Sequence, residues 1–333
     1  MKIKLKRNIQ KAAYLCIGII LAAAVLLTGT YGLSKRNLSI YKEAVSLQAK
    51  MDELRFEDFR ITDYPVAFFD GNNDYVVSGN GKEYEIVKRK PVFSTYVGTA
   101  YEVGDHYEII LPTIERFEEM FSMMDMVGNV QELEQGNVPS LEESGYEDKE
   151  QAATIWHEGF HAYQMTRFEN EIVEMMKGHT FSDEDFKEEV IVKQVDANEQ
   201  IVSLYKQELK LLKKAAFAEN IDDIKVLIIK YKELEEERRG LLPKEVLLLE
   251  EYYERIEGMA RYVEGKAYEE LYSKEAFEER YMEAFASYEK GSGKYYGIGM
   301  VKCLLLDRLA PGWKQEYDFS ESITDCLYGR IGE

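Results

Sequence analysis

The stretch ATIWHEGFHAYQM, residues 153–165, decides how this chain is interpreted. It places His157 and His161 four positions apart, and on a helix residues i and i+4 lie on one face, one turn apart. Two imidazoles in that arrangement can bind one metal ion, and Glu158 between them can take a proton from a water that attacks a carbonyl group. The apolar neighbours Ile155, Trp156, Phe160 and Ala162 are typical of a core helix, expected over residues 148–177. The alternative is a buried helix with two purely structural histidines.

A catalytic zinc ion needs a third protein ligand and an open coordination position. The longer pattern H-E-x-x-H-x-x-G-x-x-H is not present, because Gln164 and Arg167 occupy its Gly and His positions. His106 and His179 are the other histidines, and they fall in an expected strand-turn region and a loop. We therefore expect the third ligand to be a carboxylate.

The best candidate lies in RIEGMARYVEG, residues 255–265, within a helix expected over 243–272. A glycine inside a helix costs about 1 kcal/mol relative to alanine, so Gly258 indicates close approach, expected here from the His157 helix. Glu257 and Glu264 are seven residues apart and lie on nearly one face. Glu257 is the favoured ligand. Glu264 is the alternative ligand, or it supports the site from behind.

HEGFHAYQ followed far downstream by EGMARYVE resembles the gluzincin branch of the zincin metallopeptidases. The resemblance implies a Zn²⁺ ion bound by His157, His161 and Glu257, with Glu158 as the general base. It also implies a sheet before the active helix with an edge strand that pairs with extended substrate, for which YEIILP, residues 107–112, is the expected counterpart. Its motifs lie farther apart than in the best-known members, and a helical hairpin expected over 183–239 could cover or reshape the cleft.

Peptide hydrolysis also needs a group that stabilises negative charge on the carbonyl oxygen, a role that Tyr, His or Arg can fill. Tyr296 is the residue chosen for this role. The alternatives are Tyr295, Tyr262 and Arg261.

Composition excludes other classes of protein. The 333 residues can form a sizeable core, and a net charge of −20 would repel a phosphate backbone, so nucleic acid is not an expected partner. Three cysteines are too few for a disulfide scaffold, and Cys303 and Cys326 are expected to be buried thiols.

The N-terminus predicts a membrane anchor. Residues 12–34 are uncharged and long enough to cross a bilayer, and the basic tail over 1–11 favours a cytoplasmic N-terminus. The remaining chain would then be extracytoplasmic, in a single-pass protein of the cell membrane. A cleaved signal peptide is the alternative.

The expected fold class is α+β and mostly helical: a zincin-like domain over 64–333, with one N-terminal transmembrane helix and a helical juxtamembrane segment over 35–63. Short β-rich runs with Asn-Gly and other turn signals predict a small antiparallel or mixed sheet over 64–112. The expected function is a membrane-anchored zinc peptidase that acts on peptide or protein substrates. The alternative is a non-enzymatic exported protein that binds a partner through the hairpin.

Overall fold

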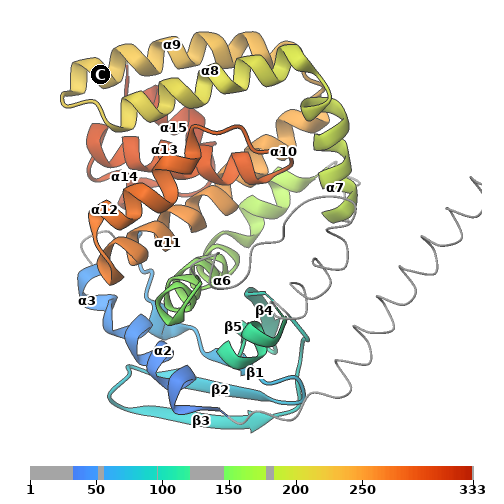
Figure 1. Cartoon of the computed structure of the whole chain (residues 1–333), viewed down its shortest axis with the longest axis vertical. Helices are drawn as coiled ribbons and strands as arrows, with labels where there is room; N and C mark the ends of the chain where they lie inside the picture. The colour runs from blue at the N-terminus through green and yellow to red at the C-terminus, as the bar shows by residue number, and fades with distance from the viewer. Residues whose placement is uncertain (1–32, 52–55, 96, 121–145, 178–183, 332–333) are drawn as a thin grey trace, which may run out of the picture.

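The computed structural model describes residues 33–51, 56–95, 97–120, 146–177 and 184–331. Five strands, β1 to β5, come first: Val66–Phe69, Asp74–Gly79, Tyr84–Arg89, Thr99–Val103 and His106–Pro112. Two short helices precede them, α2 (Lys35–Ser46) and α3 (Gln48–Met51), and helices dominate the described chain from residue 146 onward. The molecule therefore has a sheet at one end and a helical part at the other (Figure 1).

The sheet is mixed, in the order β3-β2-β1-β5-β4. Strand β1 runs parallel to β5, whereas the pairs β1–β2, β2–β3 and β4–β5 are antiparallel. The run YEIILP therefore forms an interior strand, and the expectation that it is the edge strand is wrong. Strand β4 occupies that edge, because β5 is needed to pair with the buried strand β1.

Helix α6 (Asp148–Met176) lies between the sheet and the helices from α10 (Lys244–Arg255) onward (Figure 1). Its bounds agree with the range 148–177 expected for the helix of His157, and the helix is kinked at Phe168, whose dihedral angles are not helical. Its apolar face is buried as the sequence indicates, with Trp156 and Phe160 at 1% and 0% exposure. Trp156 Nε1 also donates a hydrogen bond of 3.1 Å to the carbonyl oxygen of Ala44, which joins α6 to α2.

The helix expected over 243–272 is divided at Ile256 into α10 (Lys244–Arg255) and α11 (Glu257–Leu271). The division is a local distortion, because Ile256 keeps αR dihedral angles and its N–H still donates to the carbonyl oxygen of Tyr252 at 2.8 Å. At this point the side chain of Gln164 in α6 donates to the carbonyl oxygens of Arg255 and Ile256 at 3.3 and 3.1 Å. Glu257 directly follows the distortion.

The hairpin expected over 183–239 is shorter. It consists of α8 (Glu199–Ala216) and α9 (Ile221–Arg239), while α7 (Glu184–Ile191) and a π-helical segment, η3 (Val192–Asp196), precede it. The hairpin packs on α13 (Gly293–Leu309), at the end of the molecule opposite the sheet (Figure 1). The hairpin therefore covers the side of the helical part that is remote from the sheet, and it does not cover the region between α6 and the sheet.

The remaining elements are short. They are η2 (Ile61–Asp63), α12 (Lys274–Phe277), the π-helical η4 (Glu278–Glu283), α14 (Trp313–Glu316) and α15 (Ile323–Gly329). Cys303 and Cys326 are buried free thiols, as expected from sequence.

The membrane part of the expected fold class, and the single-pass location in the cell membrane, need correction. Among the described residues, no helix is long and apolar enough to cross a bilayer. Helix α6, for example, has 29 residues but carries charged side chains throughout its length. The segment that suggested an anchor, residues 12–34, lies outside the described residues except for its last two positions. The structure supports an α+β fold, mostly helical, with a small mixed sheet.

Candidate metal centre

Three side chains from two helices converge at one point. His157 and His161 project from α6, and their Nε2 atoms lie 3.1 Å apart. Glu257, the first residue of α11, places one carboxylate oxygen 3.5 Å from Nε2 of His157 and 3.3 Å from Nε2 of His161. In the described part of the chain, these three residues form a cluster able to hold a metal ion.

The spacing of these ligand atoms fits zinc. A tetrahedral ion with bonds of about 2.0–2.1 Å holds neighbouring ligand atoms roughly 3.3 Å apart. The three observed distances lie between 3.1 and 3.5 Å. The donor set of two imidazoles and one carboxylate is one that catalytic zinc sites use, and three protein ligands leave a fourth position open.

Hydrogen bonds at Nδ1 hold both histidines so that Nε2 faces the cluster. Nδ1 of His157 donates to Glu264 at 3.0 Å, and Nδ1 of His161 donates to Oε1 of Gln164 at 2.8 Å. The amide of Gln164 is oriented by its bonds to the two carbonyls at the α10–α11 break, because only its NH₂ group can donate to them. Each imidazole therefore directs Nε2 at the cluster, where it can bind a metal ion once that nitrogen has lost its proton.

Gln164 drew attention in the sequence only as a departure from a longer histidine motif. Its position three residues after His161 puts it one turn along the same helix, which was the available signal. Tyr281 in η4 was also not anticipated, and its hydroxyl donates to the other oxygen of Glu264 at 2.9 Å. Glu264 thus lies behind His157, whereas Glu257 lies with the ligand atoms.

The local electrostatics favour positive charge at the point of convergence. Burial alone would lower the pKa of His157, but Glu257 and Glu264 raise it to about 10. Burial would favour the neutral acid of Glu257, yet the imidazoles of His161 and His157 hold its pKa below the usual range. The carboxylate is therefore ionised at neutral pH, and the place between it and the imidazoles attracts a proton or a metal ion.

Close contact between two glycines sets the position of α11. A Cβ atom on Gly258 would lie 2.6 Å from Cα of Gly299 in α13, too close for any side chain. The expectation that Gly258 faces the His157 helix is therefore wrong. The close approach is to α13, and it fixes α11 from the side opposite α6, with which α11 also packs.

Glu158 lies on the sheet side of α6 and is 8% exposed. Gly98, just before edge strand β4, comes so near that a Cβ atom there would lie 2.7 Å from Oε1 of Glu158. Burial raises the pKa of Glu158, and the two neighbouring imidazoles act in the opposite direction. The general-base candidate is thus beside both the histidine pair and the sheet edge.

The other sequence candidates are distributed as follows. Tyr296 and Arg261 line one pocket beside the centre, and the ring of Tyr296 stacks on Tyr253 at 5.9 Å. Tyr262 is buried and donates to Asp307, and Tyr295 is buried under the hairpin, so both serve packing. His106 lies at the exposed start of β5, in contact with Asp105 and Glu108. His179 lies outside the described residues, as does Cys16, the third cysteine of the chain.

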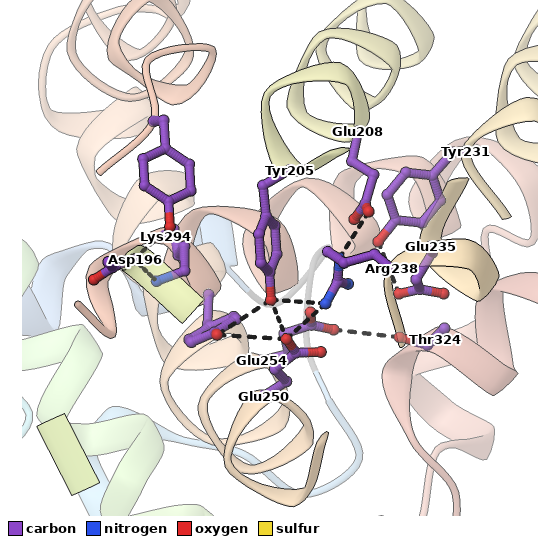
Figure 2. Close-up of polar contacts among 12 residues, drawn as sticks. Asp196, Tyr205, Glu208, Tyr231, Glu235, Arg238, Glu250, Glu254, Lys294 and Thr324 are labelled. Atoms are coloured by element: carbon purple, nitrogen blue, oxygen red, sulfur yellow. Dashed lines mark hydrogen bonds and ion pairs between the residues drawn. The ribbon is translucent and has the colours of Figure 1, made fainter. Parts of the chain in front are cut away.

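A second buried polar cluster lies beneath the hairpin, and we call it the hairpin network (Figure 2). Arg238 of α9 donates to Glu208 at 2.7 Å and to Glu250 at 2.6 Å, and Lys302 of α13 donates to Glu254 at 2.7 Å. All five side chains are at most 5% exposed. The network also includes Tyr205, Glu235 and Thr324.

Comparison of the chain with protein-family models, curated proteins and solved structures found no match.

Proposed function

We propose that this protein is a zinc-dependent peptidase of the gluzincin type. His157, His161 and Glu257 would bind the zinc ion, and Glu158 would be the general base. The observation that carries the proposal is the convergence of two Nε2 atoms and one carboxylate oxygen within 3.1–3.5 Å. The motif His157-Glu158-x-x-His161 adds a base that a purely structural metal site does not need.

Each residue has a defined task in the proposed reaction. Zinc bound at this centre would act as a Lewis acid toward a peptide carbonyl and would lower the pKa of water. Glu158 would accept the proton of the attacking water and pass it to the leaving amine, as a general base and then a general acid. Burial strengthens Glu158 as a base because it raises the pKa of the carboxyl group. Glu264 and Gln164 would hold the two imidazoles in the metal-binding tautomer.

The edge strand supports a peptide as the substrate. Strand β4 pairs with β5 on one side, and its other side is the edge of the described sheet. An extended peptide can add to such an edge through main-chain hydrogen bonds. Because Gly98, directly before β4, lies against Glu158, a peptide bound along β4 would pass the general base. The substrate-pairing role expected of residues 107–112 therefore passes to residues 99–103.

The test combines metal analysis with substitution of the base. The purified full chain should contain about one zinc per molecule, and it should cleave members of a random decapeptide library, detected by mass spectrometry. Glu158→Gln keeps the size of the side chain but cannot accept a proton at neutral pH. It should keep its zinc and lose cleavage by roughly 10² or more, the lower end of the usual general-base contribution.

Glu174→Gln is the matched control, since Glu174 is on the same helix with a side chain that is 68% exposed. It should retain full activity. Equal cleavage by wild type and Glu158→Gln would exclude this mechanism. A zinc-loaded wild type that cleaves nothing in the library would favour the non-enzymatic alternative.

A further inference from the structure

A pocket of about 300 Å³ opens beside the metal centre, between α11, η4 and α13. Its described wall includes Arg261 of α11, Arg280 and Tyr281 of η4, and Tyr296 of α13. The volume is at the lower end of the range for small-molecule sites, which suits a single side chain or a chain terminus.

Two contacts connect this pocket to the metal centre. Tyr281 on the pocket wall donates to one oxygen of Glu264, and the other oxygen of Glu264 accepts from His157. Arg261 is one helical turn after Glu257, a rise of about 6 Å along α11. That distance is roughly the length of two residues of an extended peptide. A group in the pocket would therefore belong to a substrate residue close to the scissile bond.

Arg261 has the donors to bind an anion there. Its nearest approach to Glu264 is 3.8 Å, too long for a hydrogen bond, and its side chain is 41% exposed. Its guanidinium stacks on the ring of Tyr281 at 4.9 Å, which holds the group in place. Within the described residues, Arg261 donates no hydrogen bond to the protein. A guanidinium with its donors available binds carboxylates in a two-pronged geometry.

The rest of the wall carries charges of both signs. Arg280 contributes a second guanidinium, which lies 5.7 Å from the ring of Tyr268. Lys294 contributes little, because it is paired with Asp196 at 3.2 Å. Glu289 is the acidic residue of the described wall, and the carboxylate of Glu264 lies 3.8 Å from Arg261, so the two arginines are accompanied by two carboxylates.

We infer that this pocket binds a carboxylate of the substrate, with Arg261 as the principal contact and Arg280 and Tyr296 in support. The inference rests on the proposed peptidase function and deepens it, because it defines a substrate class. Two groups of a peptide substrate carry such a carboxylate: an Asp or Glu side chain within about two residues of the scissile bond, and the free C-terminus.

The test first measures cleavage with matched peptides. A decapeptide that the enzyme cleaves is remade with each acidic residue replaced by its amide, and separately with an amidated C-terminus. Loss of the carboxylate that occupies the pocket should lower kcat/KM by about tenfold or more, because hydrogen bonds to charged groups are strong. An effect of replacing an acidic residue identifies a side-chain carboxylate, and an effect of amidating the C-terminus identifies the terminal carboxylate.

Variants then assign the effect to the pocket. Arg261→Gln should abolish the difference between acid and amide peptides, and Arg280→Gln should reduce it. Lys193→Gln, which removes a charge from a side chain that is 70% exposed and away from the pocket, should leave it unchanged. Zinc content is measured in each variant, so that a loss of metal is not mistaken for a loss of selectivity. If Arg261→Gln fails to fold, the same comparison with Arg280→Gln decides whether the pocket sets the preference.

A binding measurement separates this inference from the proposed function. Zinc-loaded Glu158→Gln is incubated with the decapeptide library, and retained peptides are sequenced. Peptides with the favoured carboxylate should be retained at least tenfold better than their amide counterparts, and the preference should disappear when Arg261→Gln is added. If wild type cleaves peptides but neither assay finds a carboxylate preference, the pocket inference fails while the peptidase stands. If the preference appears in binding but wild type cleaves nothing, the peptidase proposal fails and the anion pocket stands.

Discussion

The metal centre and the hairpin network both gather carboxylates inside the helical part, but they differ in where the balancing positive charge comes from. In the hairpin network, Arg238 donates to Glu208 and Glu250 (Figure 2). Lys302 donates to Glu254 in the same network. In the metal centre, Glu257 meets two imidazoles whose Nε2 atoms point at each other. When both neutral rings carry their proton on Nδ1, neither Nε2 atom can donate, and an added proton or metal ion is needed between them.

Exposure separates the two clusters further. The side chains of Arg238, Glu208 and Glu250 are at most 1% exposed, whereas those of His157, His161 and Glu257 are between 12% and 20% exposed. A sealed cluster with its own counterions holds helices together. An accessible cluster that lacks a permanent cation among its ligand atoms is arranged to receive one. The following experiments test whether that contrast is correct.

The largest expected effect is on the hairpin network. Arg238→Met should lower the free energy of unfolding by about 3–5 kcal/mol, because it leaves the buried carboxylates of Glu208 and Glu250 unpaired. Urea denaturation near pH 7.5 measures the change. Lys230→Met, on the exposed face of the same helix, is the control and should stay near wild type. A stability loss below about 1 kcal/mol for Arg238→Met would show that the network does not hold the hairpin in place.

The next effect concerns the metal centre. Glu257→Ala should weaken zinc binding more than 100-fold, which is at least about 2.7 kcal/mol, since it removes a ligand oxygen. Glu264→Ala should weaken it by about 10- to 100-fold, the usual range for a residue that supports a ligand from behind. Competition with a chelator of known affinity measures both. A larger loss for Glu264→Ala would exchange the two roles.

A third effect is a pH dependence that belongs to the network. Burial raises the pKa of Glu208 to about 7, with Arg238 acting in the opposite direction and Glu235 and Glu250 adding to the rise. One oxygen of Glu208 is buried without a hydrogen-bond partner among the described residues, so a proton there breaks no existing bond. The native state thus holds this proton more tightly than the unfolded chain does.

The sign of the effect follows from that difference. Between the unfolded pKa near 4.5 and the native value of about 7, this group makes stability fall as the pH rises. Its slope is at most about 1.4 kcal/mol per pH unit, or roughly 2 kcal/mol from pH 5 to 7. Glu208→Gln should remove this pH dependence. The difference in the free energy of unfolding between wild type and Glu208→Gln should therefore change between pH 5 and 7. Glu233→Gln, exposed on α9, is the control. A constant difference between wild type and Glu208→Gln would show that Glu208 does not titrate in this range.

The sequence predicted local features of the metal centre better than its surroundings. A buried helix with both histidines on one face can be predicted from local features of the sequence. These features are the i, i+4 spacing of His157 and His161 and the apolar neighbours of Trp156. The strand order is not local. Which run lies at the sheet edge depends on β5 pairing with β1 across about forty residues, and no pattern within YEIILP reports it.

The same limit applies to the partners of Gly258 and to the break at Ile256. A glycine in a helix indicates that something approaches closely, but it does not say whether the neighbour is α6 or α13. The distortion at Ile256 coincides with the amide of Gln164 on another helix, a contact that the local sequence does not show. The arrangement of such contacts is a property of packing between distant segments, and only the folded chain defines it.

Gln164 joins the two regions of sequence that form the metal centre, and it provides the smallest predicted effect. Its amide accepts from His161 at 2.8 Å and donates to the carbonyls of Arg255 and Ile256, directly before Glu257. Gln164→Met keeps the approximate shape but leaves the imidazole N–H and two carbonyls without these partners. The tautomer of His161 is then no longer fixed, and the start of α11 is held less firmly.

We expect Gln164→Met to weaken zinc binding by about tenfold, roughly 1.4 kcal/mol, the lower end of the range for such supporting residues. Gln164→Glu is the informative companion, because its carboxylate still accepts from His161 but repels the two carbonyl oxygens. If tautomer control dominates, Gln164→Glu should bind zinc nearly as well as wild type, although it unfolds more easily. If the position of α11 dominates, both variants should lose affinity alike. Unchanged affinity in both would mean that the metal centre needs neither contact, and that the histidine pair is oriented by α6 alone.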